Sequence, residues 1–90
     1  MGVAALKIKV LPKDPKADLK KLQTKIEVSL KKAGAVKINS VEIEEIAFGL
    51  KALIVTLAWP EALATEKAEE AVKIAGVSST EILDYRRAFG

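Results

Sequence analysis

The run from residue 50 to residue 59 constrains the fold more than any other part of the chain, because apolar side chains occupy both of its faces. A short apolar run that ends at Pro60 is typical of a strand, since proline cannot donate a hydrogen bond to a sheet. A strand with two apolar faces is buried on both of them, as a central strand is. We therefore predict a central strand here, with the bulkier Leu53, Val55 and Leu57 turned toward a layer of helices.

Residues 3 to 11 and 79 to 87 are also predicted to be strands. In the first of them, Leu6, Ile8 and Val10 alternate with lysines, which is the period-2 pattern of a half-buried strand. Two prolines soon afterwards end that strand. The last strand carries two arginines near its end, and charged residues at that position are typical of an edge strand.

Residues 36 to 46 form a further predicted strand with a change of face in its middle. Ile38 is at an even-numbered position, whereas Val41 and Ile43 are at odd-numbered positions, and the two kinds of position face opposite sides of a regular strand. A bulge near Asn39 accommodates such a change with little disturbance of the sheet. The glutamates that alternate with Val41 and Ile43 are then expected to face solvent.

Asp18 is the expected N-cap of a first helix, because an aspartate side chain accepts hydrogen bonds from the free backbone N–H groups of the first turn. Apolar residues at helical spacing then form one stripe that faces the core: Leu19, Leu22, Ile26 and Leu30. Lysines lie largely off the stripe: Lys20, Lys21, Lys25, Lys31 and Lys32. Gly34 is expected to end the helix in a left-handed conformation.

A second helix is predicted from Thr65, as N-cap, to Gly76, where glycine stops it. Glutamates gather near its start, where they suit the positive end of the helix dipole: Glu66, Glu69 and Glu70. Its core-facing stripe consists of small residues, which allow close packing: Ala68, Ala71, Val72 and Ala75.

The predicted elements follow the order β-α-β-β-α-β, and the chain has no repeat, linker or low-complexity segment. This order is that of the split β-α-β unit, the ferredoxin-like fold. We therefore predict a single α+β domain over residues 1–90. It is a two-layer sandwich in which a four-stranded antiparallel sheet of order 4-1-3-2 carries both helices on one face.

The composition excludes most chemistry. The chain has neither cysteine nor histidine, so it lacks thiolate nucleophiles, the commonest general base and the commonest metal ligand. The five glycines are scattered and form no phosphate-binding loop. We therefore expect no enzyme activity, no metal site and no bound cofactor. No apolar run reaches the roughly 18 residues of a membrane helix, so a cytoplasmic location is expected.

Charge is distributed unevenly along the chain. Residues 1 to 37 carry ten lysines and three acidic residues, for a net charge of +7, whereas residues 38 to 85 have a net charge of −6. The basic part either pairs with the acidic part or faces an acidic partner. RNA-recognition domains share this topology, but they stack bases on aromatic residues of their central strands, where this chain has only Trp59. Direct nucleic-acid binding is therefore expected to be limited to loose contacts of the lysine-rich helix.

Phe48 lies between two predicted strands, where a turn is expected. A large apolar side chain at a turn has two interpretations. The ring folds back and closes the end of the core, or the turn presents it to solvent as an anchor for a partner protein. Gly49 permits a positive φ angle that would aim the ring outward. The residues alone leave both interpretations open.

Two segments carry a resemblance to a known family. They are Glu45 to Leu53, which contains the Phe-Gly pair, and Asp84 to Phe89, which contains two consecutive arginines. With the length and the element order, they make the chain similar to the archaeal translation elongation factor 1-beta family. The resemblance implies a guanine-nucleotide exchange factor for elongation factor 1-alpha, the GTPase that delivers aminoacyl-tRNA. Such a factor needs no cofactor of its own, because the GDP and Mg²⁺ are bound by the GTPase.

The resemblance also implies which residues bind the partner. In this family an aromatic residue in a Phe-Gly context contacts the nucleotide-binding domain of the GTPase. That role is carried to Phe48, with Gly49 and Leu50 as its frame.

A second contact is implied at the C-terminus, through Arg86, Arg87 and Phe89. Eukaryotic relatives place a lysine there, close to the magnesium site of the GTPase. This chain has no lysine after Lys73, so the role of that lysine is not assigned to one residue.

Two other functions remain as alternatives. One is a small RNA-binding module that uses the lysine-rich helix. The other is a regulatory or scaffolding domain that self-associates through its open sheet face, near Ala5, Ala52, Ile54 and Thr56. As an exchange factor, the chain is expected to be a monomer outside its complex with the GTPase.

Overall fold

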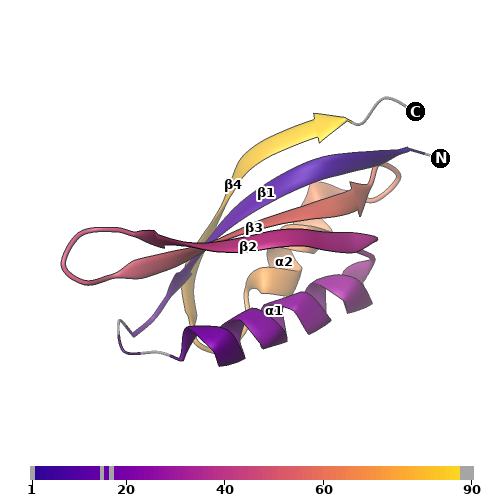
Figure 1. Cartoon of the computed structure of the whole chain (residues 1–90). Coiled ribbons are helices and arrows are strands. Elements are labelled where there is room, and N and C mark those ends of the chain that lie inside the picture. The colour runs from indigo at the N-terminus through magenta and orange to yellow at the C-terminus, as the bar shows by residue number, and fades with distance from the viewer. Residues whose placement is uncertain (1, 15, 17, 88–90) are drawn as a thin grey trace.

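The computed structural model describes residues 2–14, 16 and 18–87. The elements follow one another in the predicted β-α-β-β-α-β order (Figure 1). They are β1 (Val3–Pro12), α1 (Leu19–Ala33), β2 (Lys37–Glu45), β3 (Lys51–Pro60), α2 (Thr65–Val72) and β4 (Val77–Arg87). No helix within the described residues is long and apolar enough to cross a membrane.

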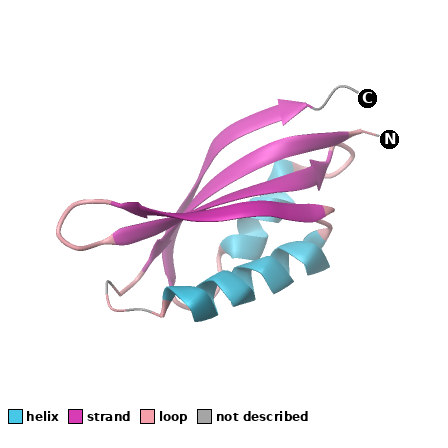
Figure 2. Ribbon diagram, in the orientation of Figure 1, coloured by secondary structure: helices cyan, strands magenta, loops and turns pink. Residues whose placement is uncertain are grey.

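The four strands form one antiparallel sheet of order β2-β3-β1-β4, which confirms the predicted order (Figure 2). The central strands β1 and β3 are paired from Val3 opposite Pro60 to Val10 opposite Leu53. Both helices cover the same face of the sheet, and β2 and β4 form its two edges. The predicted ferredoxin-like sandwich is thus the observed architecture.

The core lies between the sheet and the helices. Leu53, Val55 and Leu57 are fully buried there, as predicted, and pack with the helix residues Leu22, Ile26, Leu30, Ala68 and Val72. On the opposite face of β3, Ala52 and Ile54 are also buried, with exposed fractions of 0% and 9%. These two positions therefore offer little apolar surface for the self-association considered above.

Helix α1 begins and ends where the sequence predicts. The Asp18 carboxylate accepts hydrogen bonds from the backbone N–H groups of Lys20 and Lys21, at 3.1 and 3.2 Å. Gly34 has a φ of 127°, and its N–H donates to the carbonyls of Leu30 and Lys31. Replacing Asp18 with alanine is therefore expected to destabilise the fold by about 1 kcal/mol in chemical denaturation.

The predicted ends of α2 were wrong. Thr65 is the first helical residue, and the N-cap position belongs to Ala64, which makes no side-chain capping bond. The helix ends at Val72, whereas Gly76 adopts a positive φ in the turn before β4. Ala75 consequently lies outside the helix and is exposed.

Register shifts interrupt the pairing of both edge strands. The register of β2 against β3 shifts between Ile38 and Ser40, which confirms the bulge predicted near Asn39. On the other edge, β4 begins at Val77, and its register against β1 shifts twice, between Lys7 and Ile8 and between Leu11 and Pro12. No local pattern of residues predicted the two shifts of β4.

Candidate functional site

The hairpin that joins β2 to β3 extends beyond the helix layer, and its tip forms one end of the molecule (Figure 1). The last strand pair joins Glu45 to Lys51. Beyond that pair, the Ile46 N–H donates to the Leu50 carbonyl at 2.7 Å, and the Leu50 N–H donates to the Ala47 carbonyl at 3.2 Å. The tip is therefore a tight turn, closed by its own hydrogen bonds.

Phe48 and Gly49 occupy the two central positions of that turn, with φ angles of 61° and 76°. Two positive φ angles in succession identify a type I′ turn. This turn favours asparagine followed by glycine, because most side chains clash with the backbone at positive φ. A phenylalanine at the first central position is therefore strained, at a cost of about 1–2 kcal/mol.

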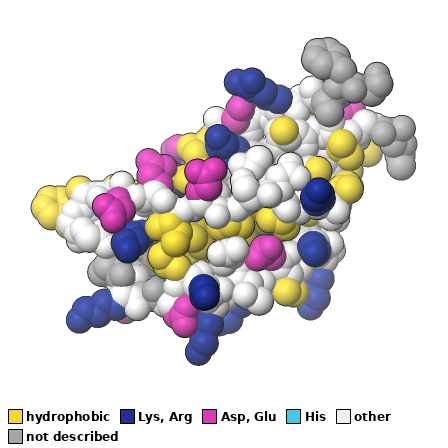
Figure 3. All heavy atoms as spheres, in the orientation of Figure 1, with side chains coloured by type: hydrophobic (Ala, Val, Ile, Leu, Met, Phe, Trp, Pro, Cys, Tyr) yellow, Lys and Arg dark blue, Asp and Glu magenta, His cyan; other side chains and the backbone are white. Residues whose placement is uncertain are grey.

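The Phe48 side chain is 97% exposed, so it does not close the end of the core. Of the two interpretations from sequence, the structure has the ring in solvent. Hydrophobic side chains are visible at the tip of the hairpin in Figure 3. An exposed aromatic ring on a strained backbone does not stabilise the isolated chain. Backbone strain and exposed apolar side chains are both concentrated at functional sites.

Two further apolar residues of the hairpin are exposed, and the sequence did not identify them. Ile43 was expected on the core side, but it is 55% exposed. The face of the sheet on which Ile43 lies was predicted correctly, since Ile43 pairs with the buried Leu53. However, β2 is an edge strand, and the core contacts of its apolar side chains include Val41 but not Ile43. Ile46 is 38% exposed, and the name apolar tip is used below for the three exposed apolar residues of the hairpin, Ile43, Ile46 and Phe48.

Gly49 sets the conformation of the apolar tip. A Cβ atom at this position would meet no atom within 4 Å, so any effect of a side chain arises from its φ of 76° alone. Gly49→Ala is therefore expected to destabilise the fold by about 1 kcal/mol in urea denaturation. Gly49→Asn is expected to cost less, because asparagine tolerates positive φ. Equal losses for the two variants would contradict this explanation.

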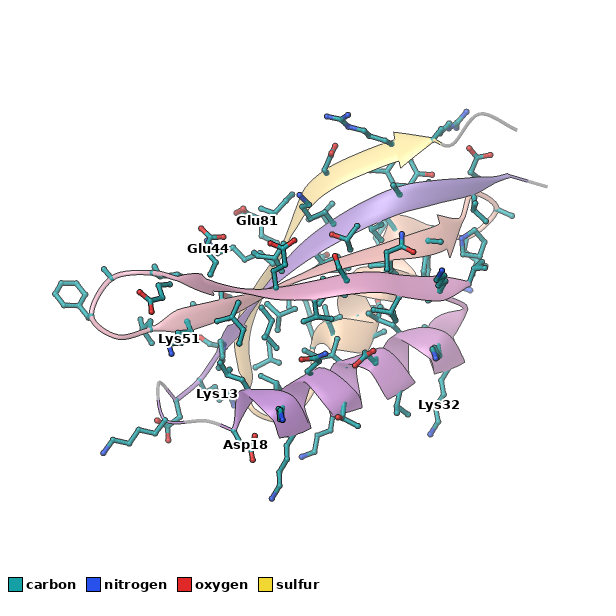
Figure 4. All side chains as sticks on the ribbon, viewed as in Figure 1. Lys13, Asp18, Lys32, Glu44, Lys51 and Glu81 are labelled. Atoms are coloured by element: carbon teal, nitrogen blue, oxygen red, sulfur yellow. The ribbon has the colours of Figure 1, made fainter. Side chains whose placement is uncertain are left out.

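Acidic side chains lie on the sheet face that the helices do not cover. Figure 4 shows Glu44 and Glu81 on that face and Lys13 and Lys32 on the helix side of the molecule. Within residues 2–14, 16 and 18–87, no group of three acidic, histidine or cysteine side chains is placed to hold a metal ion.

The arginines of the predicted C-terminal contact are also at the surface. The side chains of Arg86 and Arg87 are 81% and 78% exposed. The Nε atom of Arg86 lies 2.9 Å from an oxygen of Asp84, and that of Arg87 lies 3.9 Å from an oxygen of Glu61. Phe89, the third residue of this predicted contact, falls outside the described residues.

The structure does not bring the two predicted contacts together. β3 leads from the hairpin to Trp59, which pairs with Ala4, and Ala4 in turn pairs with Arg87. At about 3.3 Å per strand residue, Phe48 and Arg87 are on the order of 35 Å apart. Figure 1 shows the hairpin and the end of β4 at opposite ends of the sheet. No single small pocket of a partner can accommodate both.

Comparison with known proteins agrees with this architecture. Residues 5–87 match the family described as the EF-1 guanine nucleotide exchange domain. Elongation factor 1-beta of Methanosarcina barkeri is 45% identical over 97% of this chain and 99% of its own length. The Elongation factor 1-beta proteins of Natronomonas pharaonis and Archaeoglobus fulgidus are 42% and 40% identical, each over 93% of this chain and more than nine-tenths of its own length. The chain therefore belongs to the EF-1 guanine nucleotide exchange domain family.

Proposed function

We propose that this chain engages its GTPase through the apolar tip of the β2–β3 hairpin, with Phe48 as the anchor. Its family makes the chain a guanine-nucleotide exchange factor, which promotes GDP release and GTP loading on elongation factor 1-alpha. That GTPase delivers aminoacyl-tRNA during translation elongation. The proposal concerns how the exchange factor performs this task.

The observation that carries the proposal is the 97% exposure of Phe48 at a φ of 61°. A buried aromatic residue is among the commonest anchors of protein interfaces, and removing one costs 2 kcal/mol or more of binding energy, as an order of magnitude. Gly49 completes the turn that holds the ring, and Leu50 closes it through its hydrogen bonds with Ala47 and Ile46. The turn thus holds the backbone of Phe48 in place before binding, which lowers the backbone entropy lost on association.

The exchange mechanism follows from linkage. A factor that binds the nucleotide-free GTPase more tightly than the GDP-bound form must weaken GDP binding by the same ratio. A ratio of about a thousand corresponds to about 4 kcal/mol. One desolvated aromatic anchor with a few charged contacts supplies energy of that order. The factor makes and breaks no covalent bond, so we propose that it is not an enzyme in the chemical sense.

Arg86 and Arg87 form the second proposed contact, together with Phe89. Because the arginines are on the order of 35 Å from the ring, they meet a different part of the GTPase surface. Both side chains are well exposed and flexible enough to reach carboxylates or phosphates of a partner. The two arginines raise the rate of association with the GTPase and make that rate sensitive to salt, whereas Phe48 remains the anchor.

The double variant Arg86→Gln/Arg87→Gln is expected to lower the association rate with the GTPase by about tenfold at low salt. The difference from wild type should shrink as salt screens the charges. Stopped-flow fluorescence at several salt concentrations measures both effects. Lys67→Gln/Lys73→Gln removes the same charge from another surface and should change the rate less than twofold. An equal effect of both variants would indicate that only net charge matters.

The remaining features of the proposal follow from this partner. We propose that residues 1–90 act as one exchange domain, that the chain is monomeric outside its complex, and that it works in the cytoplasm with the elongation GTPase. Direct nucleic-acid binding is not needed for exchange. The test is stimulated release of fluorescent GDP from elongation factor 1-alpha, measured by stopped flow. Phe48→Ala should fold normally and lose the stimulation, whereas an unchanged rate would refute the role of the ring.

A further inference from the structure

We propose that a groove along α1, away from the apolar tip and the C-terminal arginines, binds an acidic amphipathic helix of a second partner protein. The groove lies between α1 and the segment that joins α2 to β4, and its volume is about 440 Å³. Its lining includes Lys25, Val28, Ser29, Lys32, Ile74 and Ala75. A smaller hollow toward the start of α1 shares Lys25 and Ala75, and its lining adds both Lys21 and the acidic Asp18.

The floor of the α1 groove is apolar and accessible. Val28 is 49% exposed, although it lies in the middle of a 15-residue helix, and Ile74 is partly buried. The Ser29 hydroxyl donates its hydrogen bond to the Ala71 carbonyl at 2.6 Å, so it is not available as a donor to a bound helix. A valine on the outward side of a helix has no role in the core, whereas it can pack against an apolar side chain of a bound helix.

The border of the α1 groove is basic. Lys25 and Lys32 are two helical turns apart on the same side of α1, about 10 Å from each other along the axis, and Val28 lies between them. Figure 4 shows Lys32 extending away from the sheet. Among the described residues, the ion pairs involve only Arg86 and Arg87 as cations, so the lysines of α1 do not pair with the acidic half of the chain.

The apolar floor and the two lysines of the α1 groove favour a partner that carries both apolar and acidic side chains. A helix with glutamates seven residues apart and leucines between them matches the spacing of the two lysines and the valine, since side chains seven apart lie on the same face. RNA would use the lysines but not the apolar floor, and the groove has no aromatic residue on which a base could stack. The combination of floor and border therefore favours an acidic amphipathic helix over RNA.

The experiment uses the whole chain, labelled with ¹⁵N, and a synthetic peptide whose glutamates are seven residues apart with leucines between them. Amide shifts in NMR spectra should change around Val28, Lys32 and Ile74 and remain unchanged in the hairpin. Lys25→Gln/Lys32→Gln should weaken peptide binding by about tenfold, because it removes two partly desolvated ion pairs. Val28→Ser should weaken it as well and preserve the helix, since serine and valine have similar helix propensities.

The matched control is Lys20→Gln/Lys31→Gln, which removes the same charge from the other flank of α1 and should change affinity less than twofold. A peptide with serines in place of the leucines should lose most of its affinity. Equal losses in both lysine variants would overturn the proposal in favour of unspecific attraction. Binding of a short RNA but not of the peptide would also overturn it, as would the absence of any shift at the groove. Stimulated GDP release should be unchanged in the Lys25→Gln/Lys32→Gln variant, so this result is independent of the proposed role of Phe48.

Discussion

Replacing Phe48 with asparagine is expected to stabilise the chain and, at the same time, to abolish most of its exchange activity. Asparagine tolerates a φ of 61° and precedes glycine in favoured type I′ turns, so the free energy of unfolding should rise by about 1 kcal/mol. The loss of the ring should lower stimulated GDP release by at least about 30-fold, the equivalent of about 2 kcal/mol. Urea denaturation and stopped-flow release of fluorescent GDP measure the two effects.

Two controls separate the ring from the turn. Phe48→Tyr keeps an aromatic ring at the same position and should retain most of the exchange activity. Val36 is a large apolar residue with 60% exposure that immediately precedes β2, at the end of the strand away from the hairpin. Val36→Asn should therefore leave exchange unchanged within about twofold, as a substitution away from an interface anchor does. Activity in Phe48→Asn near that of wild type would show that the ring is not the anchor.

The largest loss of stability is expected from Trp59→Ala. Trp59 is fully buried at the end of β3, and its indole N–H donates to the Leu63 carbonyl at 3.2 Å. Truncation of a buried tryptophan costs about 3–5 kcal/mol, a large part of the 5–15 kcal/mol that stabilises a typical domain. Circular dichroism during chemical denaturation is the suitable measurement, because the variant lacks the only tryptophan of the chain.

Trp59→Phe distinguishes packing from hydrogen bonding. Phenylalanine retains much of the apolar volume but leaves the Leu63 carbonyl without its donor, which costs about 1–3 kcal/mol. We therefore expect the free energy of unfolding of Trp59→Phe to lie between that of the wild type and that of Trp59→Ala. A loss below about 1 kcal/mol for Trp59→Ala would contradict the central place of this residue in the core.

The fold was predictable because its signals are local and repeated. Alternation in β1 and the two apolar faces of β3 determine which sides are buried, and Leu53 and Leu57 lie in the core as expected. The ends of α2 were not predictable in this way. The capping preference of Thr65 is worth only about 1 kcal/mol, and packing of the short helix outweighs it. Gly76 is required by the turn into β4 rather than by the helix.

The candidate site was predictable only in part. Sequence identified Phe48 and the conformational freedom of Gly49, because an aromatic residue and a glycine at a turn are unusual together. It did not identify Ile43, since periodicity gives the face of a residue but not how far the helix layer extends over that face. The large separation of Phe48 from Arg87 likewise depends on the register of three strands, which no local pattern encodes.

The most direct test of the exchange mechanism compares two affinities by calorimetric titration, one for nucleotide-free elongation factor 1-alpha and one for its GDP-bound form. For the wild-type chain, we expect the nucleotide-free GTPase to be bound about a thousandfold more tightly. Phe48→Ala should lower that ratio by at least about 30-fold, the equivalent of about 2 kcal/mol. A ratio that Phe48→Ala leaves unchanged, or the absence of a complex between the wild-type chain and the nucleotide-free GTPase, would contradict an exchange mechanism that depends on the exposed ring.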